Sequence, residues 1–280
     1  MQDLLKTYAP IALEDMKSLR LMNRMDTKFV TTRGKLFRLL ELARPYYSIQ
    51  QVDGKRVASY YTLYFDTPEL SMFRCHVSGR ANRQKLRIRS YMDNHLSYLE
   101  VKTKDNHGRT CKQRTEMPDF DATRPLPTIC FTEDDETCKA YVPFLRSYLR
   151  YDPQTLHQLI ENQFDRITLV NHARTERVTI DTHLCFHHLL NDHRRQLDDY
   201  VIIEIKRDGL LPSPILELLR QLHIKPMGFS KYCIGLIITD PSLRYNLFKP
   251  RIHQLERLWP GTRLIPFPPS MTPKPTDYTS

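Results

Sequence analysis

Several stretches of the chain place charged residues at every second position, with apolar or small polar residues between them. This spacing is typical of β-strands, because successive side chains of a strand point to opposite faces. The clearest stretches are 85–91 (KLRIRSY), 100–104 (EVKTK), 112–116 (KQRTE), 177–181 (RVTID) and 204–206 (EIK). Each stretch therefore collects its charges on one face and its apolar side chains on the other.

The stretch 200–206 (YVIIEIK) differs, because it is apolar on both faces around Glu204. Strands of this composition are usually buried on both sides. We therefore expect the charges to point into an enclosed space and the sheet to close around it.

The same patterning predicts the order of the elements. Helical spacing is expected at 11–21, 35–43 and 215–222, the last of these capped by Ser213 and started by Pro214. Turn residues between the middle strands indicate an antiparallel meander, and a helix-prone connector follows at about 132–161. Strands are expected at 24–31, 59–66, 84–92, 96–104, 109–117, 164–170, 176–182 and 199–207.

Composition adds the sign of the charge. The chain has 280 residues and a formal net charge of +10, which predicts an anionic partner such as nucleic acid, a membrane surface or a polyphosphate compound. The six cysteines form no CxxC pair, so neither a zinc knuckle nor a disulfide framework is expected. No apolar run is long enough to span a membrane and the first residues lack a signal-peptide core, so a cytoplasmic protein without a transmembrane segment is expected.

Phosphate recognition must rely on side chains, because the sequence has no GxxxxGK or GxGxxG motif. Arginine matches phosphate oxygens in two-point contacts and lysine adds a point charge, so mixed basic walls suit a chain of phosphates. A buried group of cations also requires an anion or carboxylates beside it. Glu204 and Glu100 are candidate ligands for Mg²⁺ or Mn²⁺, which bind carboxylate and phosphate oxygens.

The order of motifs resembles a known family. The motifs are RMDTKFV at 24–30, YFDT at 64–67, KLRIRSY at 85–91, YLEVKTK at 98–104, ERVTID at 176–181, VIIEIK at 201–206 and FSKY at 229–232. Together they resemble the VTC domain, the polyphosphate polymerase domain of the triphosphate tunnel metalloenzyme or CYTH superfamily. The resemblance runs in order from about residue 10 to 240.

The resemblance implies an α+β fold in which a closed antiparallel eight-stranded β-barrel forms a tunnel with flanking helices. It implies a VTC-like domain over residues 1–245, followed by an extension over 246–280 that we expect to be largely disordered from about 260. It also implies a polyphosphate polymerase that transfers the γ-phosphate of ATP to a growing polyphosphate chain and releases ADP, with Mn²⁺ or Mg²⁺ as cofactor.

Site residues follow motif by motif. The expected catalytic residues are Lys28, Arg87, Arg89, Lys102, Arg166, Arg177 and Lys231. Further phosphate-binding residues are expected to be Arg24, Lys85, Lys112, Arg114 and Lys206. Glu204 occupies the family's metal-binding position, and Glu100 is the second metal candidate. Asp66 and Asp181 are expected to be structural, the second by capping its strand or by pairing with a tunnel base.

Two departures from the superfamily pattern bear on function. Hydrolase branches open with an ExExK motif, whereas this chain has Arg24, Asp26 and Lys28 in that strand, which favours the polymerase branch. Relatives often place Tyr two residues before the arginine of the first strand after the connector, whereas this chain has Phe164 there. A hydroxyl that contacts phosphate is therefore expected to be missing.

Two other functions remain open. A tunnel triphosphatase would share the fold and hydrolyse triphosphate or nucleotides. A non-catalytic module would bind polyphosphate or nucleic acid without a metal carboxylate, and Tyr60, Tyr61 and Tyr64 would then be candidate stacking platforms or else strand core. Expected partners are ATP and polyphosphate or pyrophosphate; nucleic acid is disfavoured, and a membrane-protein partner is left open.

Overall fold

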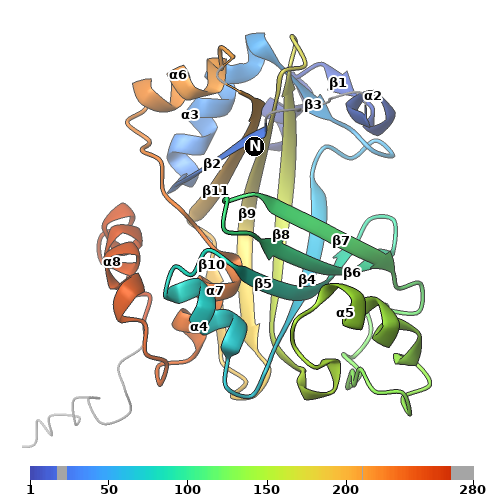
Figure 1. Cartoon of the computed structure of the whole chain (residues 1–280). Helices are drawn as coiled ribbons and strands as arrows, with labels where there is room; N and C mark the ends of the chain where they lie inside the picture. The colour runs from blue at the N-terminus through green and yellow to red at the C-terminus, as the bar shows by residue number, and fades with distance from the viewer. Residues whose placement is uncertain (18–23, 210, 266–280) are drawn as a thin grey trace, which may run out of the picture.

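The alternating stretches form one large sheet with helices around it (Figure 1). The computed structural model describes residues 1–17, 24–209 and 211–265. The strands are β1 (Pro10–Ile11), β2 (Arg24–Thr32), β3 (Tyr47–Gln50), β4 (Ala58–Asp66), β5 (Arg83–Tyr91), β6 (Leu96–Lys104), β7 (Thr110–Glu116), β8 (His157–Asn171), β9 (Glu176–His188), β10 (Arg194–Leu197) and β11 (Tyr200–Asp208). The α-helices are α1 (Gln2–Lys6), α2 (Leu13–Lys17), α3 (Arg33–Ala43), α4 (Ser71–Val77), α5 (Val142–Tyr148), α6 (Pro214–Gln221), α7 (Lys231–Thr239) and α8 (Lys249–Leu258).

The main hydrogen-bonded path of the sheet runs β2-β11-β9-β8-β4-β5-β6-β7, and all neighbours on it are antiparallel. Strands β10 and β3 add to β9 and β8, and β1 pairs in parallel with β3. All eight strands predicted from the sequence are present on this path. The prediction of an α+β fold with a large antiparallel sheet is confirmed.

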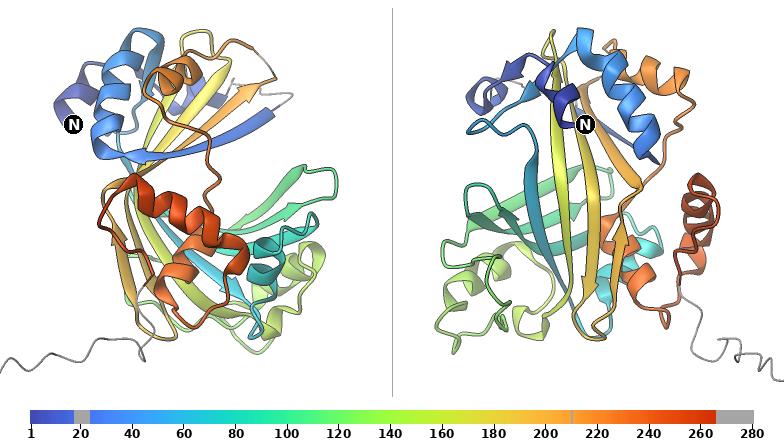
Figure 2. Two further views of the ribbon diagram at one scale, coloured as in Figure 1. Left: turned by 90° about the vertical axis from the view of Figure 1, so that its left-hand side faces the viewer. Right: turned by 180° about the vertical axis from the view of Figure 1, so that it is seen from behind.

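The prediction of a closed barrel is not supported, because the two ends of the path, β2 and β7, do not pair within the described residues. The outer edge of β2 is already occupied: the Met227 N–H donates to the Lys28 carbonyl at 2.8 Å, and Phe29 bridges to Pro226. A strand edge that bonds to one segment cannot accept another. Figure 2 shows β2 and the β6–β7 hairpin as separate ribbons.

One side of the sheet packs against helices in two separate cores. Near β2, β9 and β11, the helices α1, α3 and α6 cover residues such as Ile180, Val201 and Ile203. Near β4, β5 and β6, the segment that contains α5 covers residues such as Leu63 and Leu86. These two cores account for the apolar positions of the alternating stretches.

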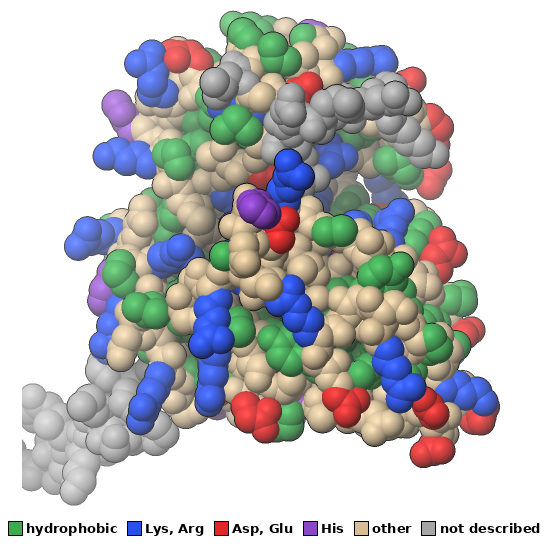
Figure 3. Space-filling model, viewed as in Figure 1, with side chains coloured by type: hydrophobic (Ala, Val, Ile, Leu, Met, Phe, Trp, Pro, Cys, Tyr) green, Lys and Arg blue, Asp and Glu red, His purple; other side chains and the backbone are tan. Residues whose placement is uncertain are grey.

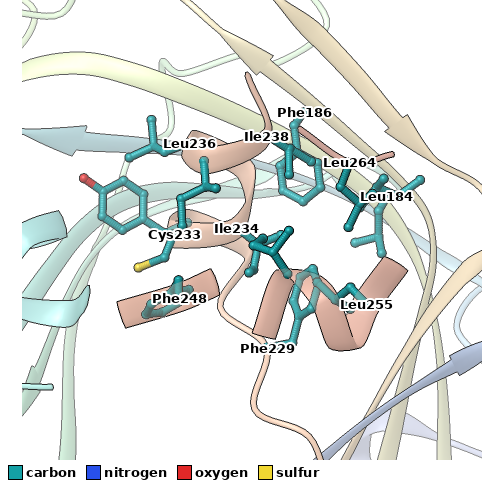
Figure 4. Packing of buried hydrophobic residues seen from close by; sticks show 14 of the residues in the cluster. Leu184, Phe186, Phe229, Cys233, Ile234, Leu236, Ile238, Phe248, Leu255 and Leu264 are labelled. Carbon is teal, nitrogen blue, oxygen red and sulfur yellow. The ribbon is translucent and has the colours of Figure 1, made fainter. Parts of the chain in front are cut away.

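The other side of the sheet is divided into an apolar part and a charged part. Helix α7 covers the apolar part, and every one of its residues from Tyr232 to Thr239 is buried. Figure 4 shows its Ile234 and Ile238 among residues of β9 and of α8, including Phe186 and Leu255. This helix explains why the stretch 200–206 is apolar on both faces: Ile202 contacts the core around α7.

Asp66 ties α4 to α7, as expected for a structural anchor. Its carboxylate accepts hydrogen bonds from the backbone N–H groups of Thr67, Met72 and Phe73 at 2.8–2.9 Å. The Tyr232 hydroxyl donates to the same carboxylate. Asp66 is fully buried, and burial raises its pKa despite these donors.

The C-terminal part contains structure that the sequence did not predict. The pattern gave no helix for α7 or α8, yet Ile252 and Leu255 of α8 and the later Leu264 join the core around α7. Residues up to 265 therefore pack with the domain, whereas the rest of the expected disordered tail lies outside the described residues. No helix within the described ranges is both long and apolar enough to cross a membrane.

Strand β9 is longer than predicted. The sequence predicted a strand over 176–182, but the strand continues to His188. The chain accommodates this with a register shift opposite residues 163–165 and a positive φ of 51° at His183. A β-bulge of this kind bends a strand without ending it.

Gly235 provides a test of how closely α7 packs on the sheet. A Cβ at this position would lie 2.5 Å from Phe186 Cδ1 and 2.9 Å from Ile160 Cδ1. We expect Gly235→Ala to lower the free energy of unfolding by about 1–3 kcal/mol, because these side chains must shift. Thermal and urea denaturation measure the change.

Gly34 is the matched control, because it also lies in a helix and a Cβ there would meet nothing within 4 Å. We expect Gly34→Ala to leave stability unchanged or raise it by up to about 1 kcal/mol. Equal effects of the two substitutions would show that α7 is not tightly packed against the sheet.

Candidate functional site

The predicted basic residues lie on one face of the sheet, named the basic face here. Residues directly opposite each other in an antiparallel pair share a face, and the register places the predicted residues opposite one another. The pairs are Lys85 with Lys102, Arg87 with Glu100, Lys102 with Lys112, Glu100 with Arg114, Lys28 with Glu204, Lys206 with Arg177, and Arg166 with Asp181. Arg89 is two residues from Arg87 and therefore also on this face.

The basic face curves so that distant strands approach each other. Strands β2 and β11 are separated from β5 and β6 by three strands along the path. Even so, the charge of Glu204 offsets part of the lowering of the Lys102 pKa that Arg87 and burial cause, and the charge of Lys28 adds to the lowering of the Lys85 pKa by burial. Such effects require proximity across the face. In Figure 3 a hollow separates the upper and lower halves of the molecule, with Lys and Arg side chains along it.

Of the predicted residues, only the side chain of Arg24 lies outside what the structure describes. The others come together from β2, β5, β6, β7, β8, β9 and β11, and Lys231 reaches the same face from the first residue of α7.

Glu100 is held between two cations. It is 1 % exposed and accepts from Arg87 Nε at 2.8 Å and from Lys112 Nζ at 3.0 Å. Burial by itself would raise the pKa of Glu100, but the charges of Arg87, Arg89 and Lys112 outweigh burial and lower it. The carboxylate therefore stays ionised and neutralises part of this wall.

Asp181 links the sheet to α7. Its two oxygens accept from Arg166 Nε at 2.6 Å and Nη2 at 2.8 Å, and Lys231 forms an ion pair with the same carboxylate. Burial would raise the pKa of Asp181, but Arg166 and Lys231 lower it. The expectation that Asp181 pairs with a tunnel base is thus confirmed.

Glu204 is more accessible than Glu100. Lys206 Nζ lies 3.0 Å from one of its oxygens and Lys28 Nζ 3.7 Å from the other, while 20 % of its side chain remains exposed. Burial opposes ionisation, but the lysines outweigh it and lower the pKa of Glu204. An ionised carboxylate with one loosely held oxygen is thus available on the basic face.

Lys85, Arg89 and Lys102 are among the cations of the basic face that have no carboxylate within salt-bridge distance in the described residues. Lys85 Nζ donates to Ser230 Oγ at 3.0 Å. Arg89 has two 3.4 Å contacts with Thr62 Oγ1 and lies over the rings of Tyr60 and Phe164. Burial lowers the pKa of Lys85 to about 8 and that of Arg89 to about 10. For Lys102 the neighbouring Arg87 charge is the largest cause, and burial adds to it, so its pKa falls well below the usual value.

A comparison with protein families finds one family whose model spans these motifs. The family model described as the VTC domain matches residues 23–239, a span that contains every residue of the basic face. The chain belongs to the VTC domain family. A search of curated protein sequences finds no match.

Solved structures similar to this VTC domain are distant from it in sequence. A proposed adenylyl cyclase from Hippeastrum with a dominant triphosphatase activity is 16% identical, with a TM-score of 0.44, and the match covers 76% of this chain and 94% of that chain. A proposed adenylate cyclase from Vibrio parahaemolyticus is 10% identical, with a TM-score of 0.42 and coverage of 76% and 97%. A conserved hypothetical protein from Pyrococcus furiosus is 15% identical, with a TM-score of 0.37 and coverage of 72% and 91%.

Aromatic rings form part of the basic face of this VTC domain; of these rings, the sequence analysis considered Tyr60 as a stacking platform. Tyr60 and Phe164 stack with their ring centres 5.1 Å apart. Arg166 lies 4.9 Å from the centre of Tyr60, and Lys231 Nζ lies 4.1 Å from that of Phe164. Phe164 thus lacks the hydroxyl of a tyrosine but keeps the aromatic ring, which attracts cations. Of the three tyrosines considered from the sequence, Tyr61 instead faces the core beneath the sheet.

The N-terminus of α7 also points to this site. Ser230 caps the helix by accepting from the Cys233 N–H at 3.3 Å and contacts Lys85 through the same hydroxyl. The unpaired N–H groups and the dipole of a helix N-terminus favour anions. Because Lys231 is the first residue of the helix, its charge adds to this effect.

The two metal candidates differ in how well they fit a divalent cation. Both oxygens of Glu100 are occupied by cations and the group is closed off, whereas Glu204 is partly exposed with one oxygen only 3.7 Å from a lysine. No group of three or more His, Cys, Asp or Glu in the described parts of the chain forms a ready metal site. Glu204 fits a site in which phosphate oxygens and water supply the other ligands, as Mg²⁺ and Mn²⁺ sites often do.

Asp181 gives a prediction about acid stability. A carboxylate whose pKa is lowered in the folded state contributes stability that is present above its unfolded pKa of about 3.9 and is lost as the pH falls through the folded value. We expect Asp181→Asn to lower the free energy of unfolding at neutral pH by about 3–5 kcal/mol, because Arg166 and Lys231 lose their partner. The difference from wild type should shrink below about pH 4.

Urea denaturation as a function of pH measures this effect. Asp3→Asn is the control, because Asp3 pairs with Lys6 on the surface and should have no measurable influence. If the deficit of Asp181→Asn stayed constant down to low pH, the ionised carboxylate would not be what stabilises the site.

Proposed function

We propose that this VTC domain is a polyphosphate polymerase, which transfers the γ-phosphate of ATP to a growing polyphosphate chain and releases ADP. The observation that carries the proposal is the excess of basic side chains on one curved face, where Lys85, Arg89 and Lys102 lack carboxylate partners among the described residues. Membership in the VTC domain family supports it. The general class, an enzyme that acts on phosphate substrates, is the firmer part of this proposal.

The reaction requires no side-chain nucleophile. A terminal oxygen of the acceptor chain attacks the γ-phosphorus, a new phosphoanhydride bond forms, and the bond between the β- and γ-phosphates breaks to leave ADP. The acceptor oxygen is already anionic near neutral pH, so catalysis depends on in-line positioning and on neutralising charge. Acceptors in this proposal are polyphosphate or pyrophosphate.

The basic residues have distinct roles in this proposal. Lys85, Arg89 and Lys102 bind the phosphates, because no carboxylate within the described residues neutralises them. Arg166 and Lys231 are held in place by Asp181 and point at the same region, so they can stabilise charge that develops on the transferred group. Binding a polyanion here also offsets the cost of holding these cations close together.

Glu204 would hold the divalent cation, with Lys28 and Lys206 beside it. When bound, Mn²⁺ or Mg²⁺ neutralises charge on the phosphate oxygens and makes the phosphorus more electrophilic. Glu100 is assigned to neutralising Arg87 and Lys112 instead of binding metal.

A product assay tests the proposed reaction. Purified protein is incubated with ATP and Mn²⁺, and the products are resolved by gel electrophoresis and ³¹P NMR. We expect long phosphate chains and ADP, with Glu204→Gln and Arg89→Ala slower by roughly 10²–10³-fold. Arg38→Ala is the matched control, since Arg38 is exposed and pairs with Glu41 away from the basic face.

The other outcomes of this assay point to the two remaining functions. Orthophosphate without chains would replace the polymerase proposal by a tunnel hydrolase. ATP that binds tightly and remains intact would indicate a binding module.

The lysine pKa values predict proton uptake on binding. Burial lowers the pKa of Lys85 and Lys231 to about 8, so both are partly neutral in the free protein near that pH. A bound polyanion favours the charged forms and raises both pKa values. We therefore expect net proton uptake when triphosphate binds near pH 8, and an affinity that falls as the pH rises further.

Calorimetric titrations in buffers of different ionisation enthalpy measure the number of protons taken up. Lys231→Met should reduce it, whereas Lys6→Met, a substitution on the exposed surface, should not. Heats that are the same in all buffers, or proton release, would contradict the assignment of these lysines to phosphate binding.

A further inference from the structure

A strip of four aromatic rings crosses the basic face from its centre to the end of the β5–β6 hairpin. Phe164 of β8 stacks on Tyr60 of β4. Tyr60 contacts Tyr91 of β5 with ring centres 5.1 Å apart, and Tyr91 meets Tyr98 of β6 edge to face at 6.0 Å. The strip is continuous over four neighbouring strands, and the three tyrosines are only partly buried.

Tyr91 differs from the other three rings, because no Lys or Arg in the described chain lies over it. Arg166 lies over Tyr60 and Phe164, and Arg114 lies 4.3 Å from the centre of Tyr98. The neighbouring tyrosines meet Tyr91 at interplanar angles of 56° and 89°, so neither is stacked flat on it. Tyr91 is thus fixed in place without a stacked partner.

Tyr91 shares its face of β5 with Arg87 and Arg89, because these three residues are two apart along the strand. The cavity of about 500 Å³ at the hairpin end lies mostly beneath the other face of the sheet, where Ser90, Ser97 and Phe120 line it. A ligand on the basic face therefore meets the ring of Tyr91 and not this cavity.

The spacing of Arg89 and Tyr91 along β5 fits a nucleotide. Tyr91 follows Arg89 by two residues on the same face, a separation of about 7 Å along the strand. This is comparable with the length of the ribose between phosphate and base.

We propose that Tyr91, between Tyr60 and Tyr98, is the stacking platform for the base of the nucleoside triphosphate. The inference rests on the proposed function and extends it: the phosphates bind Arg89 and the lysines, while the base lies on the ring of Tyr91 at the hairpin end of the basic face. Tyr91 then distinguishes a nucleotide from inorganic triphosphate, because only the nucleotide has a ring to stack. Base stacking on an aromatic side chain strengthens binding about tenfold or more.

Equilibrium binding of ATP and of inorganic triphosphate, measured by calorimetry for wild type and variants, tests the proposal. We expect Tyr91→Ala to weaken ATP binding about tenfold and to leave triphosphate binding unchanged. Tyr91→Phe keeps the ring and should bind both as wild type does. Tyr46→Ala is the control for loss of an exposed tyrosine far from the strip along the sheet.

The outcomes separate this proposal from the proposed function. Unchanged ATP binding in Tyr91→Ala, or an equal loss for ATP and triphosphate, would overturn the platform while wild-type binding still supports a phosphate site. Failure of the wild-type protein to bind either compound would overturn the proposed function itself, and the platform with it. Circular dichroism of Tyr91→Ala shows whether a loss for both ligands comes from unfolding.

Discussion

The ion pairs of Asp181 determine how helix α7 meets the sheet. One buried carboxylate joins Arg166 of the sheet to Lys231 at the start of α7. Without it, two cations would face each other in a space that water scarcely reaches, and α7 would be repelled where it begins. With it, the helix starts at a fixed point and its apolar residues cover the adjoining part of the sheet. The boundary between apolar core and basic face therefore lies at this carboxylate.

The basic face has fewer carboxylates than cations, so it keeps a net positive charge. This excess of positive charge is what allows it to bind phosphates. Glu100, Asp181 and Glu204 each hold two cations, while Lys85 and Lys102 have no such partner in the described chain and have lowered pKa values. Crowding of like charges costs stability, and a bound polyanion removes that cost. A protein that already holds its cations in place loses little side-chain entropy when phosphates bind.

Period-two alternation made most of the sheet predictable, because burial of one face leaves few alternatives for strands such as β5 and β6. It located the basic face for the same reason. The sequence did not predict that the sheet stays open. The hydrogen bonds that occupy the edge of β2 come from an irregular segment at Pro226 and Met227, which has no strand pattern. Helix α7 escaped prediction because it is buried all round, which removes the periodicity by which a helix is recognised. The aromatic strip escaped because contacts between four strands depend on register.

The basic face uses two kinds of partner for its cations, and the difference explains how it stays basic. A carboxylate fixes an arginine or lysine and cancels its charge, as Glu100 does for Arg87. An aromatic ring fixes a cation through its quadrupole and leaves the charge in place, as Tyr98 does for Arg114. Phe164 likewise keeps an aromatic ring against Arg166 and Lys231, without the hydroxyl that a tyrosine would add. A site for a chain of phosphates requires cations that are held in place but keep their charge.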